Sequence, residues 1–515
     1  MNENLFAALN QPMSAAPDKT ALLLSEDRQI SFGQLLDRAG SLCTLLEELG
    51  VQADDRILVQ VDKSVANVVL YLATLQLGAV YVPINTAYTR EEVQYFLDDA
   101  QPALLVLDDV TRCSQLTLTH GSGAAQCYAL GACAEDAEAS QSVDSLLQRS
   151  ASLPAQTRVA QRSAADMAAI LYTSGTTGRS KGAMLSHGNL LSNARTLLDL
   201  WGWRKQDVLL HALPIFHVHG LFVALHCAFL GASTIIFRPA FNAADVCTWL
   251  GQATVMMGVP TFYTRLLSEP QFDQTLVSGM RLFISGSAPL TEQTFAAFEA
   301  RSGHRILERY GMSETLMNTS NPLNGERVPG SVGYALPGVE LRVVDDHGAQ
   351  CAAEAVGEIE VRGVNVFAGY WQMPEKTAAE FRNDGFFRTG DLATRAADGR
   401  VAIVGRGKDL VISGGYNVYP KEVERLLDTM PGVVESAVIG VPHADFGEAV
   451  VAVIVAEPDK AGPDLSSVSS FLQERVARYK QPKHVALVAQ LPRNAMGKVQ
   501  KNGLREAYKD LFKEP

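Results

Sequence analysis

The sequence lacks several features that would define particular classes of protein. Its most apolar stretch, residues 223–237, is interrupted by His226, Ser233 and Thr234. It is also shorter than the roughly 20 residues that a membrane-spanning helix requires. The N-terminus has neither the basic segment nor the apolar core of a secretory signal. The seven cysteines are scattered, odd in number and without a Cys-x-x-Cys pair, which argues against a zinc site and fits a reducing compartment. We therefore expect a cytoplasmic protein with no membrane partner.

An excess of positive charge is also missing. The formal net charge of -12 would repel the phosphates of a nucleic acid, so we expect no nucleic-acid partner. An anionic substrate would have to be captured by local cations and not by the overall field. The chain has 515 residues, which is enough for two or more domains with a large core.

Strand-like and helix-like patterns alternate along the first two thirds of the chain, which predicts parallel sheets covered by helices. The strand candidates are residues 56–61, 80–84, 103–107, 209–213, 233–237, 255–259 and 282–285, with helical patterns at 65–77 and 90–99. Turn residues become denser at about 330–404, which indicates a small β subdomain. We expect an α/β fold with a large domain at 1–407, built of two mostly parallel sheets and this β subdomain. A small α+β domain should follow at 408–515, with helical patterns at 421–430, 467–479 and 502–511.

A glycine- and hydroxyl-rich segment follows the short apolar stretch 167–171. It reads Tyr172-Thr173-Ser174-Gly175-Thr176-Thr177-Gly178-Arg179-Ser180-Lys181-Gly182. Free backbone N–H groups, hydroxyls and one lysine together can cradle phosphates. The Walker A spacing is excluded, because that motif places glycine directly before the lysine and Ser or Thr after it. A glycine-rich surface turn is the alternative interpretation.

Five further motifs stand at wide intervals, and each is weak alone. They are Ser285-Gly286-Ser287-Ala288-Pro289, Glu308-Arg309-Tyr310-Gly311-Met312-Ser313-Glu314-Thr315, Thr389-Gly390-Asp391, Gly405-Arg406-Gly407-Lys408-Asp409 and Pro492-Arg493-Asn494-Ala495-Met496-Gly497-Lys498. In this order, over nearly the whole chain, they resemble the adenylate-forming superfamily of acyl-CoA synthetases, peptide-synthetase adenylation domains and luciferases. Ser180 before the lysine, Leu213 to Gly220, and Glu308 to Thr319 are similar to the malonyl-CoA synthetases within it.

The resemblance implies an ATP site whose residues have suitable chemistry. Thr173 to Gly178 and Lys181 would hold the β- and γ-phosphates, and Asp391 and Arg406 would hold the ribose. Gly286 to Ala288 and Tyr310 would hold the adenine, with the phenol ring stacked on the base. Glu314 and Thr173 would hold Mg²⁺, a hard cation that prefers oxygen ligands. The implied ATP-binding set is Thr173, Ser174, Gly175, Thr176, Thr177, Gly178, Lys181, Gly286, Ser287, Ala288, Tyr310, Gly311, Met312, Ser313, Glu314, Asp391, Arg406 and Lys498.

The resemblance also implies two half-reactions in one cleft. ATP first converts a carboxylate into an acyl-adenylate with release of pyrophosphate, and the thiol of CoA then displaces AMP. Lys498, the implied catalytic lysine of the first step, would spread the developing negative charge. The small domain would then rotate as a mobile lid about Lys408 and bring Ser413, Gly414 and Gly415 to the CoA channel. Acetylation of Lys498 would remove its charge and stop the first step.

The acid is predicted to be malonate. A second carboxylate buried as an anion requires a cationic partner, and a guanidinium fork matches it well. Arg265 and Arg309 stand where malonyl-CoA synthetases would bind that group. His217 would line the pocket near the reacting carboxylate, and Val218 and Met317 would bound the α-carbon. Their size would decide whether methylmalonate is also accepted.

Three alternatives stay open at this point. The chain could ligate a short- or medium-chain monocarboxylic acid to CoA, or load an acyl group onto a separate carrier protein. It could also be a non-catalytic nucleotide- or CoA-binding regulator. The presence of Lys181, Glu314, Asp391 and Lys498 disfavours the last of these, because a catalytically dead relative should have lost at least one.

Overall fold

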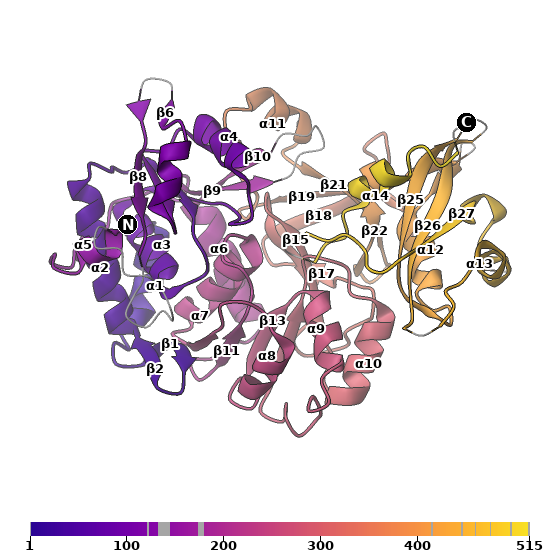
Figure 1. The fold of residues 1–515 in the computed structure, drawn as a ribbon, viewed down its shortest axis with the longest axis horizontal. Coiled ribbons are helices and arrows are strands. Elements are labelled where there is room, and N and C mark those ends of the chain that lie inside the picture. Colours follow the sequence, from indigo (N-terminus) through magenta and orange to yellow (C-terminus); the bar gives the residue numbers. More distant parts are fainter. Residues whose placement is uncertain are drawn as a thin grey trace.

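In the computed structural model, two large sheets form the framework of the N-terminal part of the chain (Figure 1). The structure describes residues 2–120, 123–131, 145–173, 180–413, 416–443, 446–458, 460–473, 475–494 and 497–512. The nine-stranded sheet has the order β17-β16-β15-β14-β13-β11-β12-β1-β2. The seven-stranded sheet has the order β20-β10-β9-β4-β3-β5-β8.

Parallel pairing dominates the centre of both sheets, and antiparallel strands lie toward their ends. The strands of the first sheet are β1 (Thr20–Ser25), β2 (Arg28–Ser31), β11 (Val208–His211), β12 (Thr234–Phe237), β13 (Val255–Gly258), β14 (Leu282–Ser285), β15 (Leu307–Met312), β16 (Leu316–Ser320) and β17 (Tyr334–Ala335). Those of the second are β3 (Arg56–Gln60), β4 (Val80–Pro83), β5 (Leu104–Leu107), β8 (Gln126–Ala129), β9 (Met167–Thr173), β10 (Lys181–Ser186) and β20 (Gly369–Tyr370).

Helices cover both sheets (Figure 1), and the buried apolar side chains form one large cluster and a second, smaller one between α4 and the seven-stranded sheet. They are α1 (Leu5–Ser14), α2 (Phe32–Glu48), α3 (Val65–Leu77), α4 (Arg90–Ala100), α5 (Leu146–Ser150), α6 (His187–Leu200), the π-helix η2 (His219–Leu225), α7 (His226–Leu230), α8 (Ala243–Leu250), α9 (Pro260–Leu267) and α10 (Glu292–Ser302). The helix α3 is buried along its whole length, as expected for a helix that is apolar on all sides.

A smaller antiparallel sheet follows, as the density of turn residues predicted. It has the order β18-β19-β21-β22. Its strands are β18 (Val339–Val344), β19 (Gly357–Gly363), β21 (Phe387–Arg395) and β22 (Val401–Arg406), and α11 (Pro374–Glu380) precedes β21. It lies between the large sheets and the C-terminal domain (Figure 1).

The C-terminal domain, called the lid below, has a mixed sheet of its own with an apolar cluster on each face. Its elements are β23 (Val411–Ser413), β24 (Tyr416–Val418), α12 (Pro420–Leu427), β25 (Val433–His443), β26 (Gly447–Ala456), α13 (Leu465–Leu472), η4 (Arg478–Lys480), β27 (His484–Val488) and α14 (Lys501–Tyr508). The expected fold, a large domain of mostly parallel sheets plus a small α+β domain, is confirmed. The border between residues 407 and 408 stays a prediction; both residues lie in the 3₁₀ turn η3 (Gly407–Asp409).

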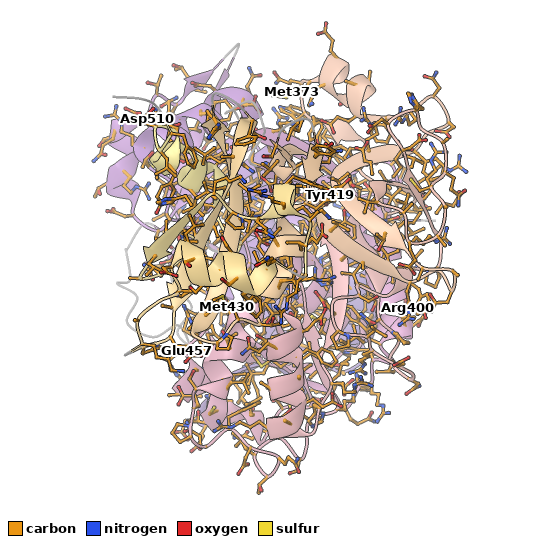
Figure 2. All side chains as sticks on the ribbon, turned by 90° about the vertical axis from the view of Figure 1, so that its right-hand side faces the viewer. Met373, Arg400, Tyr419, Met430, Glu457 and Asp510 are labelled. Carbon is orange, nitrogen blue, oxygen red and sulfur yellow. A yellow bond between two sulfur atoms is a disulfide. The ribbon has the colours of Figure 1, made fainter. Side chains whose placement is uncertain are left out.

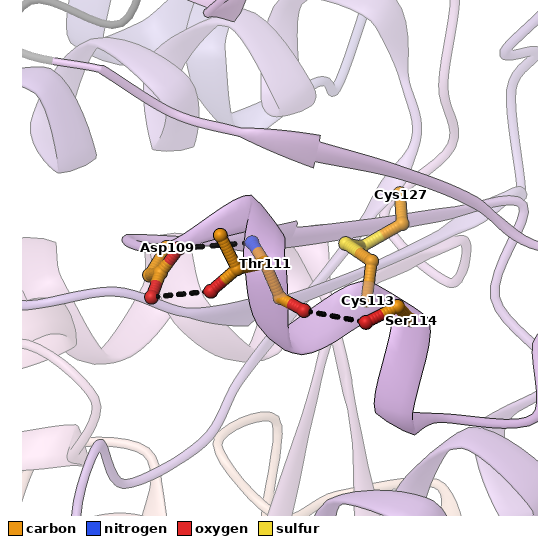
Figure 3. Close-up of a disulfide and its surroundings, with 5 residues drawn as sticks. All are labelled: Asp109, Thr111, Cys113, Ser114 and Cys127. Carbon is orange, nitrogen blue, oxygen red and sulfur yellow. Dashed lines mark hydrogen bonds between the residues drawn. A yellow bond between two sulfur atoms is a disulfide. The ribbon is translucent and has the colours of Figure 1, made fainter.

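A disulfide that the sequence did not predict joins Cys113 to Cys127 (Figure 3). Cys113 lies in the 3₁₀ helix η1 (Val110–Gln115), which Asp109 caps by accepting from the N–H of Thr111, and Cys127 lies in β8. The scattered spacing gave no indication of this pair, because only the parallel pairing of β5 with β8 brings the two segments together. In the part of the chain that the structure describes, no helix combines the length and apolarity needed to cross a bilayer.

Candidate functional site

The phosphate-cradle segment joins two antiparallel strands at the edge of the seven-stranded sheet. Thr173 ends β9 and Lys181 begins β10, and these two residues are paired in register. The loop between them is therefore held at both ends by a ladder of backbone hydrogen bonds. The predicted phosphate ligands Ser174, Gly175, Thr176, Thr177 and Gly178 lie outside the described residues.

A buried carboxylate, Glu314, lies next to the base of this hairpin. One of its oxygens accepts from Thr173 Oγ1 at 3.3 Å and from the hydroxyl of Tyr370 at 3.1 Å. Burial raises the pKa of Glu314, while the hydrogen bonds and Arg406 oppose that shift. The two predicted magnesium ligands, Glu314 and Thr173, are thus in contact. Their oxygen atoms fit Mg²⁺, which takes one or two protein ligands together with phosphate oxygens and water.

Lys181 lies against the same tyrosine. Its Nζ is 4.7 Å from the centre of the Tyr370 ring and 3.6 Å from Glu380 Oε1 on α11. Lys181 is 8% exposed, and Glu380 is its carboxylate partner among the described residues. Because this ion pair is long and the lysine side chain is flexible, the ammonium can turn toward an incoming anion.

A second group of side chains surrounds Asp391 on β21. Asp391 Oδ2 accepts from the hydroxyl of Tyr310 at 2.6 Å, and Asp391 Oδ1 lies 2.8 Å from Arg406 Nε. Asp391 and Arg406 face each other in the β21–β22 pairing, so the sheet itself sets their separation. The predicted ribose and adenine residues Asp391, Arg406 and Tyr310 therefore form one cluster.

Lys498 of the lid lies close enough to this cluster for the charges of Arg406 and Asp391 to act on it. Burial lowers the pKa of Lys498 to about 8, with a further lowering by Arg406, while Asp391 and Asp409 oppose the shift. The loop before it packs against the start of α9, because a Cβ added to Gly497 would lie 3.1 Å from Thr261 Oγ1. The lid is therefore oriented with Lys498 at the predicted nucleotide site.

Arg309 is a buried guanidinium with unused hydrogen-bonding capacity. It is 3% exposed, and its Nε and Nη2 have no hydrogen-bond partner among the described residues. Burial lowers the pKa of Arg309 to about 10. The guanidinium lies directly over Gly286, where a Cβ would be 2.6 Å from Arg309 Nε. A buried cation of this kind is costly unless an anion joins it.

Two histidines lie near Arg309. His217 accepts from the N–H of His219 through Nδ1 at 3.4 Å, and His219 Nδ1 is 3.3 Å from Ser287 Oγ. Burial lowers the pKa of His217 to about 4 and also lowers that of His219, and Arg309 lowers both. Both rings are therefore neutral near pH 7. Ser287 has φ +70°, a strained conformation of the kind found at functional sites.

The other predicted residues are placed as follows. Val218 and Met317 are buried, Met317 on β16 and Val218 just before the π-helix η2. Gly311 and Met312 end β15, Ser313 follows them, and Ala288 lies half-buried after β14. Lys408 lies in η3 and Ser413 ends β23, whereas Gly414 and Gly415 lie outside the described residues.

The predicted role of Arg265 beside Arg309 stays a prediction. Arg265 lies on α9 with its side chain exposed, and no ion pair or hydrogen bond joins the two arginines to a shared group in the described part of the chain. Its predicted contact with the distal carboxylate is untested.

Three residues of the site were missed by sequence reasoning. Tyr370, Glu380 and His219 contact Glu314, Lys181 and Ser287 respectively. Tyr370 and Glu380 carry no local signal, because their partners come from strands distant in the sequence. His219 lay in the segment 213–220 that supported the resemblance, and its spacing from His217 could have identified it.

Comparison with known proteins gives consistent results. A model of the family described as AMP-binding enzyme matches residues 9–371, and one described as AMP-binding enzyme C-terminal domain matches residues 422–498. A mitochondrial malonate–CoA ligase of Mus musculus is 34% identical, covering 94% of this chain and 87% of that protein. The ATP-bound crystal structure of MatB from Rhodopseudomonas palustris is 50% identical over the whole of both chains, with a TM-score of 0.94. The apo structure of that protein gives a TM-score of 0.81, so this chain has an arrangement closer to the ATP-bound form.

Proposed function

Because the chain belongs to the AMP-binding enzyme family, we propose that it ligates malonate to coenzyme A, with malonyl-adenylate as intermediate. In the first half-reaction a carboxylate oxygen of malonate attacks the α-phosphorus of ATP, and pyrophosphate leaves. In the second, the sulfur of CoA attacks the activated carbonyl carbon, AMP leaves, and the thiol proton is released. The products are malonyl-CoA, AMP and pyrophosphate.

One observation carries the choice of a dicarboxylate: the buried guanidinium of Arg309 has two nitrogens without a partner among the described residues. The distal carboxylate of malonate supplies the missing negative charge and accepts hydrogen bonds from Arg309 Nε and Nη2. His217 and His219, both neutral beside it, leave Arg309 as the charged group of this pocket. A monocarboxylic acid would leave the guanidinium buried and unpaired.

The ATP-site residues act mainly by positioning and by neutralising charge, which is what phosphoryl chemistry requires of a protein. Lys181 leaves Glu380 for the β- and γ-phosphates, helped by Thr173 and the loop 174–178. Asp391 accepts from the ribose hydroxyls, with Arg406 beside it, while Tyr310 and residues 286–288 and 311–313 border the adenine. Glu314 and Thr173 would hold Mg²⁺, which would supply charge neutralisation at the phosphates.

Lys498 acts in the first step only. Its ammonium lies between the carboxylate and the α-phosphate and stabilises the charge that develops there. The lid then rotates about Lys408, withdraws Lys498 and brings Ser413 with Gly414 and Gly415 to the channel for the CoA thiol. Acetylation of Lys498 would abolish the charge and stop the first step alone.

The finer specificity rests on Val218 and Met317, whose buried side chains border the position of the α-carbon. Methylmalonate adds one methyl group there, a difference worth only about 1–3 kcal/mol, so it is a candidate second substrate. Arg265 is exposed in this arrangement and would have to turn inward to reach the distal carboxylate. We also propose that the protein is cytoplasmic, that its substrates are all small molecules, and that it has no nucleic-acid partner.

The decisive experiment replaces the guanidinium. We expect Arg309→Leu to lower kcat/KM for malonate by the equivalent of about 2–5 kcal/mol, the usual cost of removing one partner of a buried charge pair. Turnover of butyrate should fall much less, because butyrate has no distal carboxylate. Pyrophosphate release with a panel of small acids measures both, and Arg265→Leu in the same assay tests the second arginine predicted to bind the distal carboxylate.

Two results would redirect the proposal. Unchanged malonate activity in Arg309→Leu would favour the alternative of a CoA ligase for short- or medium-chain monocarboxylic acids. Malonate-dependent pyrophosphate release without any malonyl-CoA in the mass spectrum would favour loading of a separate carrier protein.

A further inference from the structure

The lid contacts the large domain through α12, at a place distant in sequence from both Lys498 and Lys408. In Figure 2 the lid faces the viewer, and the labels of Tyr419 and Met430 bracket this helix. Arg425 of α12 donates from Nη2 to the backbone oxygen of Gly330 at 3.3 Å, and its Nε lies 3.8 Å from Glu292 Oε1. Gly330 leaves room for this contact, because a Cβ there would collide with the Arg425 guanidinium.

Behind this contact lies a buried carboxylate of the large domain. Glu308 is 6% exposed, its Oε1 accepts from the N–H of Leu290 at 3.2 Å, and its Oε2 has no partner among the described residues. Burial raises the pKa of Glu308 to about 7, and Lys421 and Arg425 of the lid oppose that shift. The docked helix therefore brings two positive charges toward Glu308, which lies directly before Arg309 in β15.

Within the lid, α12 is tied to the segment that carries the catalytic lysine. Lys501 Nζ pairs with Glu424 Oε1 at 2.5 Å, and the same oxygen of Glu424 accepts from the N–H of Val438 at 2.9 Å. Lys501 follows Lys498 by three residues, and Glu424 is the neighbour of Arg425. One ion pair therefore joins the helix that carries Arg425 to the segment that carries Lys498.

We propose that Arg425 is a positioning residue: by docking on Gly330 and Glu292 it holds the lid in the orientation in which Lys498 reaches the nucleotide site. This inference rests on the proposed two-step function, because only that function requires the contact to form and then break. Loss of the contact depopulates the orientation of the first half-reaction and leaves the second unimpaired. Among the described residues, Arg425 contacts Gly330 and Glu292 of the large domain, and neither is a predicted substrate ligand, so we assign its effect to the orientation of the lid.

The test separates the two half-reactions. Arg425→Ala should slow malonate-dependent exchange of pyrophosphate into ATP by about three- to tenfold, the range for losing one partly exposed charged hydrogen bond. Formation of malonyl-CoA from supplied malonyl-adenylate should stay within about twofold, on the same scale. Arg475→Ala is the matched control, because Arg475 lies on the lid and donates to the backbone oxygen of Phe471 in the same domain. The side chains of Arg425 and Glu292 are 42% and 60% exposed. Because their replacement leaves the core intact, a lower exchange rate in these variants would not be explained by misfolding.

A charge exchange makes the result specific. Arg425→Glu should be worse than Arg425→Ala, because it faces Glu292 and Glu308, and adding Glu292→Arg should restore part of the exchange rate. Equal losses in both half-reactions, or no loss in either, would overturn the proposal.

A measurement that needs no turnover tests the contact of Arg425 with Gly330 and Glu292, called the latch here, independently of the proposed function. Hydrogen exchange of residues 326–333 in the presence of ATP should be faster in Arg425→Ala than in the natural protein. If the natural protein shows no malonate-dependent exchange of pyrophosphate into ATP, the proposed function is wrong. The difference in hydrogen exchange between the two proteins would still test the Arg425 contact. Unchanged hydrogen exchange would refute the latch whatever the substrate.

Discussion

The absence of a side chain at Gly286 is the condition for the anion site at Arg309. The guanidinium occupies the space over the glycine Cα, and the backbone there is not in the left-handed region, so alanine is excluded by contact alone. We expect Gly286→Ala to displace Arg309 and to lower kcat/KM for malonate by about 1–3 kcal/mol, the usual cost of overpacking. Initial rates over a malonate series would measure it.

Two controls make the Gly286 experiment informative. The fall for butyrate should be smaller, because butyrate has no use for the guanidinium. A rise in the KM for ATP of the same size as the loss for malonate would contradict this account, since it would indicate damage to the adenine side of the same loop.

A pH profile follows from the position of Lys498. Its pKa is lowered to about 8, chiefly by burial and then by Arg406. A lysine is charged below its pKa, so raising the pH through about 8 removes the ammonium that the first half-reaction uses. We expect kcat/KM for pyrophosphate exchange to fall about tenfold for each pH unit well above this value.

The control is a cation that does not titrate there. Lys498→Arg should have a lower plateau but no such limb, because a guanidinium stays charged throughout this range. Thioester formation from supplied malonyl-adenylate should not fall along the same limb in the natural protein. A shared limb would show that another group controls both steps.

Whether a residue of the site could be predicted depends on whether its role is set by its own motif or by a partner distant in the sequence. The chemistry of Glu314, Asp391 and Lys498 could be predicted, because each lies in a motif whose residue types match a ligand. The ring of Tyr370 beneath Lys181 could not, since it depends on β20 pairing with β10. The Cys113–Cys127 disulfide was missed for the same reason.

Among the elements, α3 was predicted at residues 65–77 and begins and ends there. Ser64 caps it by accepting from the N–H of Asn67, and Gly78 ends it with φ +78°. Helix signals of this kind are local and can be read directly. By contrast, a helical pattern with apolar residues through Tyr479 continues past the end of α13 at Leu472. Val476 lies in a turn and Tyr479 in the 3₁₀ helix η4, and both pack on the same core as α13. The helical spacing of apolar residues is therefore also compatible with a backbone that is not an α-helix.

The full burial of α3 gives a prediction about stability. Leu70 is 0% exposed, and Leu70→Ala should lower the free energy of unfolding by about 2–5 kcal/mol, the range for a large-to-small change in a core. Chemical denaturation followed by circular dichroism would measure the shift. Leu487→Ala is the matched control: this leucine is 52% exposed on β27, and its loss should change stability by less than about 0.5 kcal/mol. Similar losses at both positions would mean that burial does not set the cost.

At the scale of the whole molecule, the structure represents one of two orientations that the proposed reaction needs. Lys498 is at the nucleotide cluster, and α12 is docked on the large domain. The sequence could predict that two domains exist, because their patterns differ. It could not predict which orientation the lid adopts, since that depends on a few contacts of about 1 kcal/mol each between surfaces distant in the sequence.

The predicted hinge, Lys408, offers a way to hold this orientation. Lys408 lies in the 3₁₀ turn η3, a type of backbone whose usual φ of about -50 to -70° includes the value that proline imposes. Lys408→Pro is therefore compatible with the orientation described here and resists the change of backbone angles that rotation requires. We expect pyrophosphate exchange to stay within about threefold of the natural protein, because the first half-reaction uses the orientation already present. Malonyl-CoA formation should fall by at least about a hundredfold, equivalent to nearly 3 kcal/mol. Lys408→Ala removes the same side chain without fixing φ, and it should retain both half-reactions. If Lys408→Pro forms malonyl-CoA at the natural rate, the lid does not turn about this residue, and the thiol must reach the adenylate without the proposed rotation.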